Sequence, residues 1–224
     1  IFPFINKSGK SQYGSISETI TDQIIANLIK DKESINFVEI ISREELDKII
    51  KERMLSSEGM LNEDEFNKIA KVIGAHEIVI GQITQIFANE ETQMPDSYHE
   101  NQSILVGYKQ RVNEYGIIVS EPIFENIAAK IIINTKKANA KIHGSYKFIE
   151  VTTAKILLSD SVTGYFNFEH IWGRFEGDER ALSDKSLKLV SQPQRYPPTK
   201  EEMVFLASKD LVKSLTETIK RYLK

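Results

Sequence analysis

The segment Ser8-Gly9-Lys10-Ser11 comes closest to a known chemical motif. Glycine, lysine and serine in this order form the second half of a phosphate-binding loop, whose backbone amides surround the phosphates. The full motif needs another glycine five positions before Gly9, and that position is Phe4. The next helix is predicted to begin only at Ser15, so its positive end would not meet a phosphate. The residues therefore favour a polar loop over a nucleotide site.

Histidines and acidic pairs are the next candidates for chemistry. No histidine has a second one at a helical or strand spacing suited to a metal ion. His99, between Asp96 and Glu100, allows a weak metal site, but a polar loop is the better interpretation. His170 shares its parity with three aromatic side chains, which is typical of a packed and hydrogen-bonded histidine. The remaining histidines are His76 and His143, and the aromatic residues are Phe166, Phe168 and Trp172.

Acidic pairs occur at Glu44-Glu45, Asp64-Glu65 and Asp178-Glu179. The first two lie in predicted first turns of helices, where negative charge complements the helix dipole. The chain has no cysteine, which excludes disulfides, zinc–thiolate sites and cysteine nucleophiles. Nothing brings a nucleophile, a base and an electrophile together at a meaningful spacing. We predict no catalytic, metal-binding or cofactor-binding residues, and no cofactor.

The first part of the chain alternates strands and helices, which predicts an α/β fold. Ile78-Val79-Ile80 is apolar on both faces, as in a strand covered on both sides. Gly74 is expected to end the helix before it. The predicted order is a strand ending near residue 5, a helix from Ser15, a strand at 36–41, a helix after Ser42, a helix after Asn62 and the strand from Ile78.

The second part is predicted to be mostly β-structure. Residues 89–102 are polar and contain Pro95, so we expect a loop, followed by short strands from 103 to 175. Residues 138–151 and 154–162 are expected to form a hairpin around Thr152-Thr153. A proline-rich linker at 192–198 then leads to a long helix. That helix should run from Lys200 to about Tyr222, behind a capping box of Thr199 and Glu202 and with an apolar residue at every fourth position.

Composition limits the class of protein. The 224 residues carry a net charge of -3 and are 41% hydrophobic, which is normal for a soluble globular protein. Near-neutral charge argues against a nucleic-acid partner. No apolar run approaches the roughly 18 residues of a membrane helix.

We expect one domain over residues 1–224. Because the chain begins at Ile1, we also expect an N-terminally truncated fragment, whose membrane attachment is an N-terminal lipid anchor outside it.

Several segments are similar to the CsgG-like family. Residues 1–9 resemble its opening motif "PF-x-N-x-S-G", and residues 40–52 resemble "V-x-R-x-x-L-x-x-I-x-x-E". Residues 69–84 resemble "A-x-x-L-G-A-x-x-L-V-x-G-x-I-T". Residues 148–157 resemble the hairpin motif "V-D-x-x-T-G-x-I", with Glu150 and Ala154 where aspartate and glycine are usual. Alanine tolerates a positive φ poorly.

The resemblance implies an α/β fold with a mixed central sheet, flanking helices and a long C-terminal helix, similar to CsgG and the N-terminal domain of TolB. It also implies a lipoprotein in the periplasm, associated with the outer membrane of the bacterial cell envelope. We predict a non-catalytic envelope domain that binds protein partners in assembly or regulation. The alternatives are a subunit of an oligomeric outer-membrane secretion channel, which would make the chain a homo-oligomer, and an enzyme with an unrecognised site.

A channel subunit would need lipid-facing hairpins, with strands of about 9–11 residues and apolar side chains at every second position. Residues 104–119 are the best candidate. Lys109 and Arg111 share one parity there, however, and Glu114 occupies the other. We therefore predict a water-soluble chain, with residues 103–137 folded as sheet or loop on the domain and not inserted in a bilayer.

Overall fold

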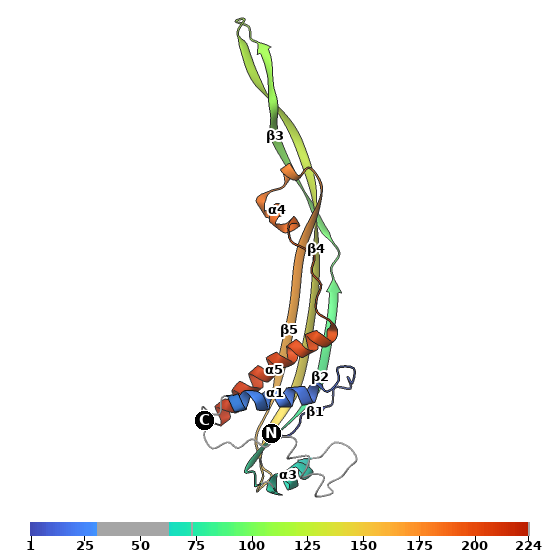
Figure 1. The fold of residues 1–224 in the computed structure, drawn as a ribbon, viewed down its shortest axis with the longest axis vertical. Helices are drawn as coiled ribbons and strands as arrows, with labels where there is room; N and C mark the ends of the chain where they lie inside the picture. Colours follow the sequence, from blue (N-terminus) through green and yellow to red (C-terminus); the bar gives the residue numbers. More distant parts are fainter. Residues whose placement is uncertain (31–62, 73, 224) are drawn as a thin grey trace. The chain divides into compact units, whose positions relative to one another are not determined.

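The computed structural model describes residues 1–30, 63–72 and 74–223 (Figure 1). The strand and helix predicted at 36–41 and after Ser42 lie outside these ranges. The described elements are β1 (Ile5–Asn6), α1 (Ile16–Lys30), α3 (Glu63–Val72), β2 (Glu77–Thr92), β3 (Asp96–Val112), β4 (Ile118–Glu150), β5 (Ile156–Gly177), the short 3-10 helix η2 (Glu179–Ala181), α4 (Asp184–Val190) and α5 (Lys200–Tyr222).

The five strands form one mixed sheet in the order β1-β2-β4-β3, with β5 also paired to β4. β1 runs parallel to β2, whereas β3 and β4 are antiparallel. The predicted α/β class, with its mixed sheet, flanking helices and long C-terminal helix, is confirmed.

The chain divides into two compact units. Unit 1 contains residues 1–89, 139–167 and 198–224, and unit 2 contains residues 90–138 and 168–197. That these units fold as one domain stays a prediction.

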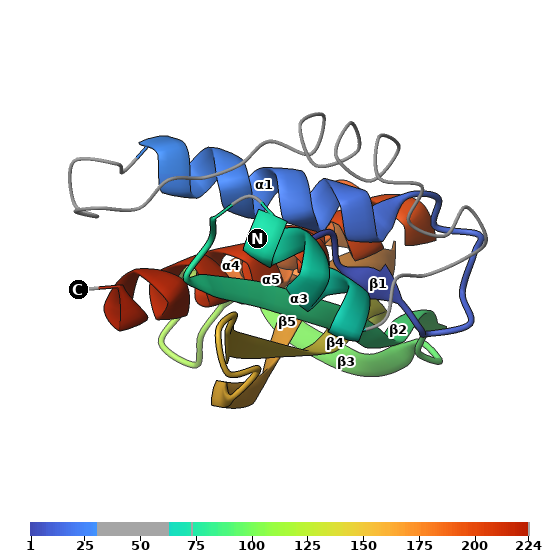
Figure 2. The same cartoon turned by 90° about the horizontal axis from the view of Figure 1, so that it is seen from below.

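In unit 1, α1 and α5 lie against each other on one face of the strands (Figure 2). Their apolar residues recur every four positions, so each helix presents one broad apolar face to the sheet. The α5 row is almost completely buried, with at most 1% exposure for Met203, Ala207, Leu211, Leu215 and Ile219. The α5 helix begins at Lys200, as predicted, and the hydroxyl of Thr199 accepts a hydrogen bond from the Glu202 amide at 3.2 Å.

The other face of unit 1 carries α3 at one end. Ile69 and Ala70 of α3 pack in one apolar cluster, which also contains Phe2, Ile78, Ile80, Ile149 and Val151. Val79, which points to the opposite side of β2, is buried as well. The prediction that this strand is covered on both faces is therefore confirmed. Gly74 follows α3 with a φ of +73°, as expected for a residue that ends a helix.

The prediction of a loop at 89–102 is wrong. β2 continues to Thr92, β3 begins at Asp96, and only residues 93–95 connect them. Pro95 falls in this connection, where it disturbs no strand pairing. The expectation of short strands is also wrong, because β4 spans 33 residues and β5 spans 22. Polar residues such as those of β3 form a strand here because each has a backbone partner on β4, which no local apolar pattern reveals.

The hairpin predicted around Thr152-Thr153 is confirmed, with β4 ending at Glu150 and β5 starting at Ile156. The Glu150 amide donates to the carbonyl of Lys155 at 2.9 Å. Ala154 adopts a φ of +56°, so the turn keeps a left-handed residue at the place where the family motif has glycine.

Replacing Ala154 with glycine should stabilise the protein. A left-handed φ costs an L-residue about 1–2 kcal/mol, and glycine adopts it freely but loses more chain entropy on folding. We expect a net gain of about 0.5–1 kcal/mol in the free energy of unfolding, measured by urea titration. An unchanged or lower midpoint would contradict the assigned backbone conformation.

Candidate functional site

The distal hairpin, residues 103–126, is the most unusual surface of unit 2. It consists of the second half of β3, the turn at 113–117 and the first part of β4 (Figure 1). The pairing of β3 and β4 runs from Asp96↔Ile133 to Val112↔Ile118, with one irregularity between Leu105 and Gly107. Because directly paired residues lie on the same face of an antiparallel ladder, the register assigns each side chain to a face.

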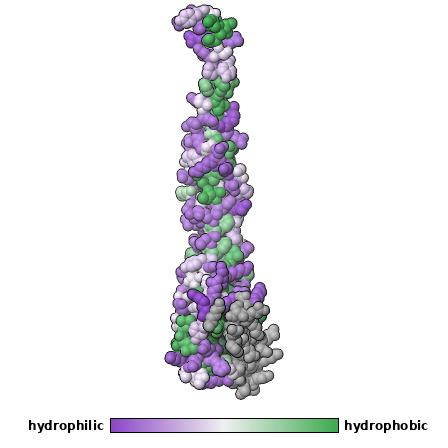
Figure 3. Space-filling view, turned by 90° about the vertical axis from the view of Figure 1, so that its left-hand side faces the viewer, coloured by the Kyte–Doolittle hydropathy of each residue, from purple (hydrophilic) through white to green (hydrophobic). Residues whose placement is uncertain are grey.

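One face of the distal hairpin is apolar. The pairs Leu105↔Phe124, Tyr108↔Pro122 and Val112↔Ile118 lie on it, and their side chains are exposed. We call these six residues the apolar face. Between them lies one polar pair, Gln110↔Ser120. Figure 3 shows hydrophobic side chains, in green, along this part of the molecule. From Ile118 to Phe124 the face is about 20 Å long at roughly 3.4 Å per residue.

The opposite face carries charge. Arg111, Lys109 and Gly107 pair there with Val119, Glu121 and Ile123. The Lys109 Nζ lies 3.2 Å from Glu121 Oε2, and the Arg111 Nη1 lies 3.3 Å from Glu121 Oε1. Exposed ion pairs such as these add little stability in water. Their main consequence is that the ribbon is amphipathic, with charges segregated from the apolar face.

Glu114 does not lie in a strand. It belongs to the turn, where the side-chain oxygen of Asn113 accepts hydrogen bonds from the amides of Tyr115 and Ile117, and where Gly116 has a φ of +75°. The sequence interpretation treated 104–119 as one strand, so it placed Glu114 among the apolar side chains, and this placement is wrong. The asparagine and glycine at 113 and 116 are the turn signal that would have corrected it.

A second feature of unit 2 is the α4 segment, residues 178–191, which is held on β3 by Glu100. The Glu100 carboxylate accepts hydrogen bonds from the Ser183 amide (2.6 Å), the Ser183 hydroxyl (2.8 Å) and the Ser186 hydroxyl (2.8 Å). The Tyr98 hydroxyl lies 2.7 Å from the same Ser186 oxygen. The Ser183 amide is the main cause of a lowered pKa at Glu100. The contacts fix the segment at the base of the hairpin.

After the α4 segment the chain crosses to the other side of β5. Leu189 and Val190 lie against Gly173 on one side, whereas His170 lies 2.7 Å from the carbonyl oxygen of Pro193 on the other. The ring of His170 also stacks on Trp172, with 5.7 Å between centroids. The prediction that His170 is packed and hydrogen-bonded is confirmed.

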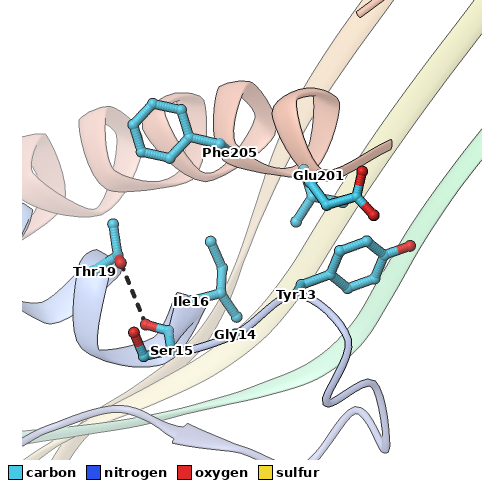
Figure 4. A pocket seen from close by; sticks show the side chains of 8 residues that line it. Tyr13, Gly14, Ser15, Ile16, Thr19, Glu201 and Phe205 are labelled. Carbon is cyan, nitrogen blue, oxygen red and sulfur yellow. Dashed lines mark hydrogen bonds between the residues drawn. The ribbon is translucent and has the colours of Figure 1, made fainter. Parts of the chain in front are cut away.

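A small pocket lies in unit 1 between the first turns of α1 and α5 (Figure 4). Its volume is about 220 Å³. The Thr19 hydroxyl in its wall donates to the carbonyl of Ser15, and Glu201 is the single ionisable group besides a tyrosine. The arrangement offers no nucleophile–base pair. The lining residues are Tyr13, Gly14, Ser15, Ile16, Thr19, Glu201, Val204 and Phe205.

The polar loop at residues 6–11 is closed by its own side chains. The Asn6 side-chain oxygen accepts from the amide and the hydroxyl of Ser8, and the Ser8 hydroxyl accepts from the Lys10 amide. The α1 helix starts at Ile16, one residue after the predicted start at Ser15. His99 and Glu100 are neighbours on β3 and therefore point to opposite faces, so they do not meet as the metal alternative required. Within the described ranges, no group of three metal-ligating side chains occurs.

We expect ATP and GTP not to bind at Ser8 to Ser11. The amides of Ser8 and Lys10 already donate to side chains, and the positive end of α1 lies beyond the loop. Calorimetry should give no heat of binding at micromolar nucleotide. Micromolar affinity that is lost in Lys10→Ala would contradict this prediction.

The fold and the hairpin define a mixed α/β protein that carries an amphipathic two-stranded ribbon. The family model described as "Curli production assembly/transport component CsgG" matches residues 2–175. The chain belongs to the CsgG family, as the motifs in the sequence predicted. A comparison with the curated proteins found no match.

Family membership assigns the chain to the secretion and assembly components of the cell envelope, at the outer membrane. The family description is that of a transport component and not of an enzyme. The match includes β3, the distal hairpin and most of β5, and it ends before the α4 segment. Among the described helices, none is both long and apolar enough to cross a membrane.

Proposed function

We propose that the chain is a non-catalytic subunit of an oligomeric secretion channel, and that the apolar face of its distal hairpin enters the outer membrane. The observation that carries the proposal is that all charged side chains of the two strands lie on one face of the distal hairpin, whereas the opposite face carries the six exposed apolar residues and no charge. Membrane-spanning strands need apolar side chains outward over a band of about 25 Å, close to the length of the apolar face. Glu114, which argued against insertion, lies in the turn.

The backbone of the distal hairpin supports an assembly of several copies. β3 is the last strand of the sheet, and β5 ends at Gly177, beside Ala128 of β4. Along the distal hairpin, both outer edges therefore lack a neighbouring strand in the part of the chain that the structure describes. Unpaired backbone groups cost several kcal/mol each in lipid, so an inserted hairpin requires strands from other copies.

Replacing Tyr108 with lysine should abolish insertion. Tyr108 lies in the middle of the apolar face and is 64% exposed. A lysine on the lipid side near the bilayer midplane costs about 2–4 kcal/mol per hairpin. We expect residues 1–224 of the wild type, prepared without any lipid modification, to float with vesicles of phosphatidylethanolamine and phosphatidylglycerol and to give conductance steps in planar bilayers. In Tyr108→Lys, the partition coefficient between vesicles and water should fall at least 30-fold.

Ile123→Lys is the matched control. Ile123 occupies the neighbouring rung, is also exposed at 40%, and lies on the charged face. A lysine there faces water in an inserted hairpin, so flotation should stay within about twofold of the wild type. Equal losses in both variants would show that charge on either face is harmful, and absence of flotation in the wild type would reject the channel.

A second candidate function is the binding of a protein partner in the envelope by the same apolar face. The polar pair Gln110↔Ser120 in the middle of the face favours it, because a protein can satisfy these groups and hydrocarbon cannot. A wild type that does not bind vesicles but is retained on an envelope protein, with the retention lost in Tyr108→Lys and kept in Ile123→Lys, would establish this alternative.

A further inference from the structure

The α4 segment lies on the face of the β3–β4 pair that continues into the charged face of the distal hairpin. Its Ala181, Leu182, Leu189 and Val190 pack with Ile127, Ala129 and Ile131 of β4 in one apolar cluster. These β4 residues alternate along the strand with the same parity as Glu121 and Ile123, and the pairing shows no irregularity on β4 between them. Hydrogen bonding to Asp178 is the main cause of the raised pKa of Arg180 in the segment, and the Glu125 carboxylate of β4 contributes to it. The segment and the charged face of the hairpin are therefore continuous.

The segment is held firmly in this position. Ser186 is fully buried, and its hydroxyl bonds to Glu100 while lying 2.7 Å from the Tyr98 hydroxyl. Asp178 accepts from the Arg180 amide and guanidinium at the start of the segment. The Asp178 amide in turn donates to the carbonyl of Ala128 on β4 at 3.0 Å. Because hydrogen bonds tie Asp178 to β4 and Ser186 to β3, the segment projects from the sheet in a fixed position.

We propose that the α4 segment narrows the entrance of the water-filled pathway. This inference rests on the proposed channel function. If the apolar face of the hairpin contacts lipid, the charged face must contact water, since buried charge is costly in hydrocarbon. The α4 segment then projects into the aqueous side, at the base of the hairpin. Its outer surface carries exposed charged residues and Leu187, and these side chains face passing solutes.

Thiol chemistry tests the inference directly, because the chain has no cysteine of its own. Leu187→Cys places one thiol on the outer surface of α4, where Leu187 is 36% exposed and its loss should not disturb folding. A bulky methanethiosulfonate reagent is added to channels formed by residues 1–224 in a planar bilayer. We expect the single-channel conductance of Leu187→Cys to fall by at least a third on modification, and to recover on reduction.

His99→Cys is the matched control. His99 lies on β3 next to Glu100, at the same level as the α4 segment but on the opposite face of the ribbon, and it is exposed. Modification there should leave the conductance within about a tenth of its starting value. Labelling of both cysteines is verified by mass spectrometry.

The outcomes separate the two proposals. Channels that form normally and keep their conductance after complete modification of Leu187→Cys would overturn the inference and leave the channel function standing. The same holds if His99→Cys is blocked as strongly as Leu187→Cys. If unmodified wild-type protein forms no channels, the proposed channel function is wrong, and the inference that the α4 segment narrows the pathway is wrong as well.

Discussion

Gly164→Ala should destabilise the protein by about 3 kcal/mol or more, at the upper end of what overpacking costs in protein cores. Gly164 of β5 lies directly beneath α5. A Cβ atom at this position would stand 2.5 Å from the backbone nitrogen of Leu211, and closer still to the carbonyl oxygen of Ala207. Both atoms belong to helix backbone, so no side chain can rotate away. The helix itself must move off the sheet.

Thermal unfolding measures this effect. For a chain of this size, a loss of about 3 kcal/mol lowers the melting temperature by roughly 6–12 °C. Gly107→Ala is the matched control, because Gly107 is also a strand glycine but a Cβ atom added there would have no neighbour within 4 Å. Its melting temperature should stay within about 2 °C of the wild type. A Gly164→Ala variant as stable as Gly107→Ala would mean that α5 does not cross β5 here.

Leu211→Ala should cost about 2–5 kcal/mol, the range for truncating a buried leucine. The Leu211 side chain is 1% exposed in the middle of the α5 row. Its removal leaves a cavity between α5 and the sheet that the close contact at Gly164 cannot fill, since the helix already touches the strand. Urea unfolding followed by circular dichroism gives the change in free energy.

Lys213→Ala serves as the control for the helix, because Lys213 lies two positions away on the exposed side. Alanine is a good helix former, so stability should change by less than about 0.5 kcal/mol. A loss below about 0.5 kcal/mol for Leu211→Ala would show that α5 is exposed in solution.

The sequence predicted the parts of the fold that local patterns determine. The capping box at Thr199 and the four-residue apolar row located α5 to the residue, and the apolar run at Ile78 identified a strand covered on both sides. The helix signal succeeds because burial of one face imposes one period on the side chains, and the strand signal succeeds because burial on both faces makes consecutive residues apolar.

The candidate site was harder to predict because the side-chain pattern of its strands changes along their length. β3 is polar along its first half and gains its backbone partners from β4, which lies at least six residues further along the chain. The amphipathic character of the hairpin also depends on the irregularity at Leu105 and Gly107, which shifts the parity of every later residue on β3. Counting every second residue along β3 therefore assigns residues before and after the irregularity to the wrong common face. The Asn113 turn is the one local signal of the true register.

The path of the chain around β5 limits how copies can assemble. Between Val190 and Pro193 it passes from one side of β5 to the other and so occupies the outer edge of that strand. Edge-to-edge contact at this level can use only β3, and a single edge can only form an isologous pair, which stops at two copies. A heterologous contact, which closes into a ring, needs two different edges. Within the described residues of unit 2, the distal hairpin provides both, so in the proposed channel the ring closes through the segment from 103 to 126.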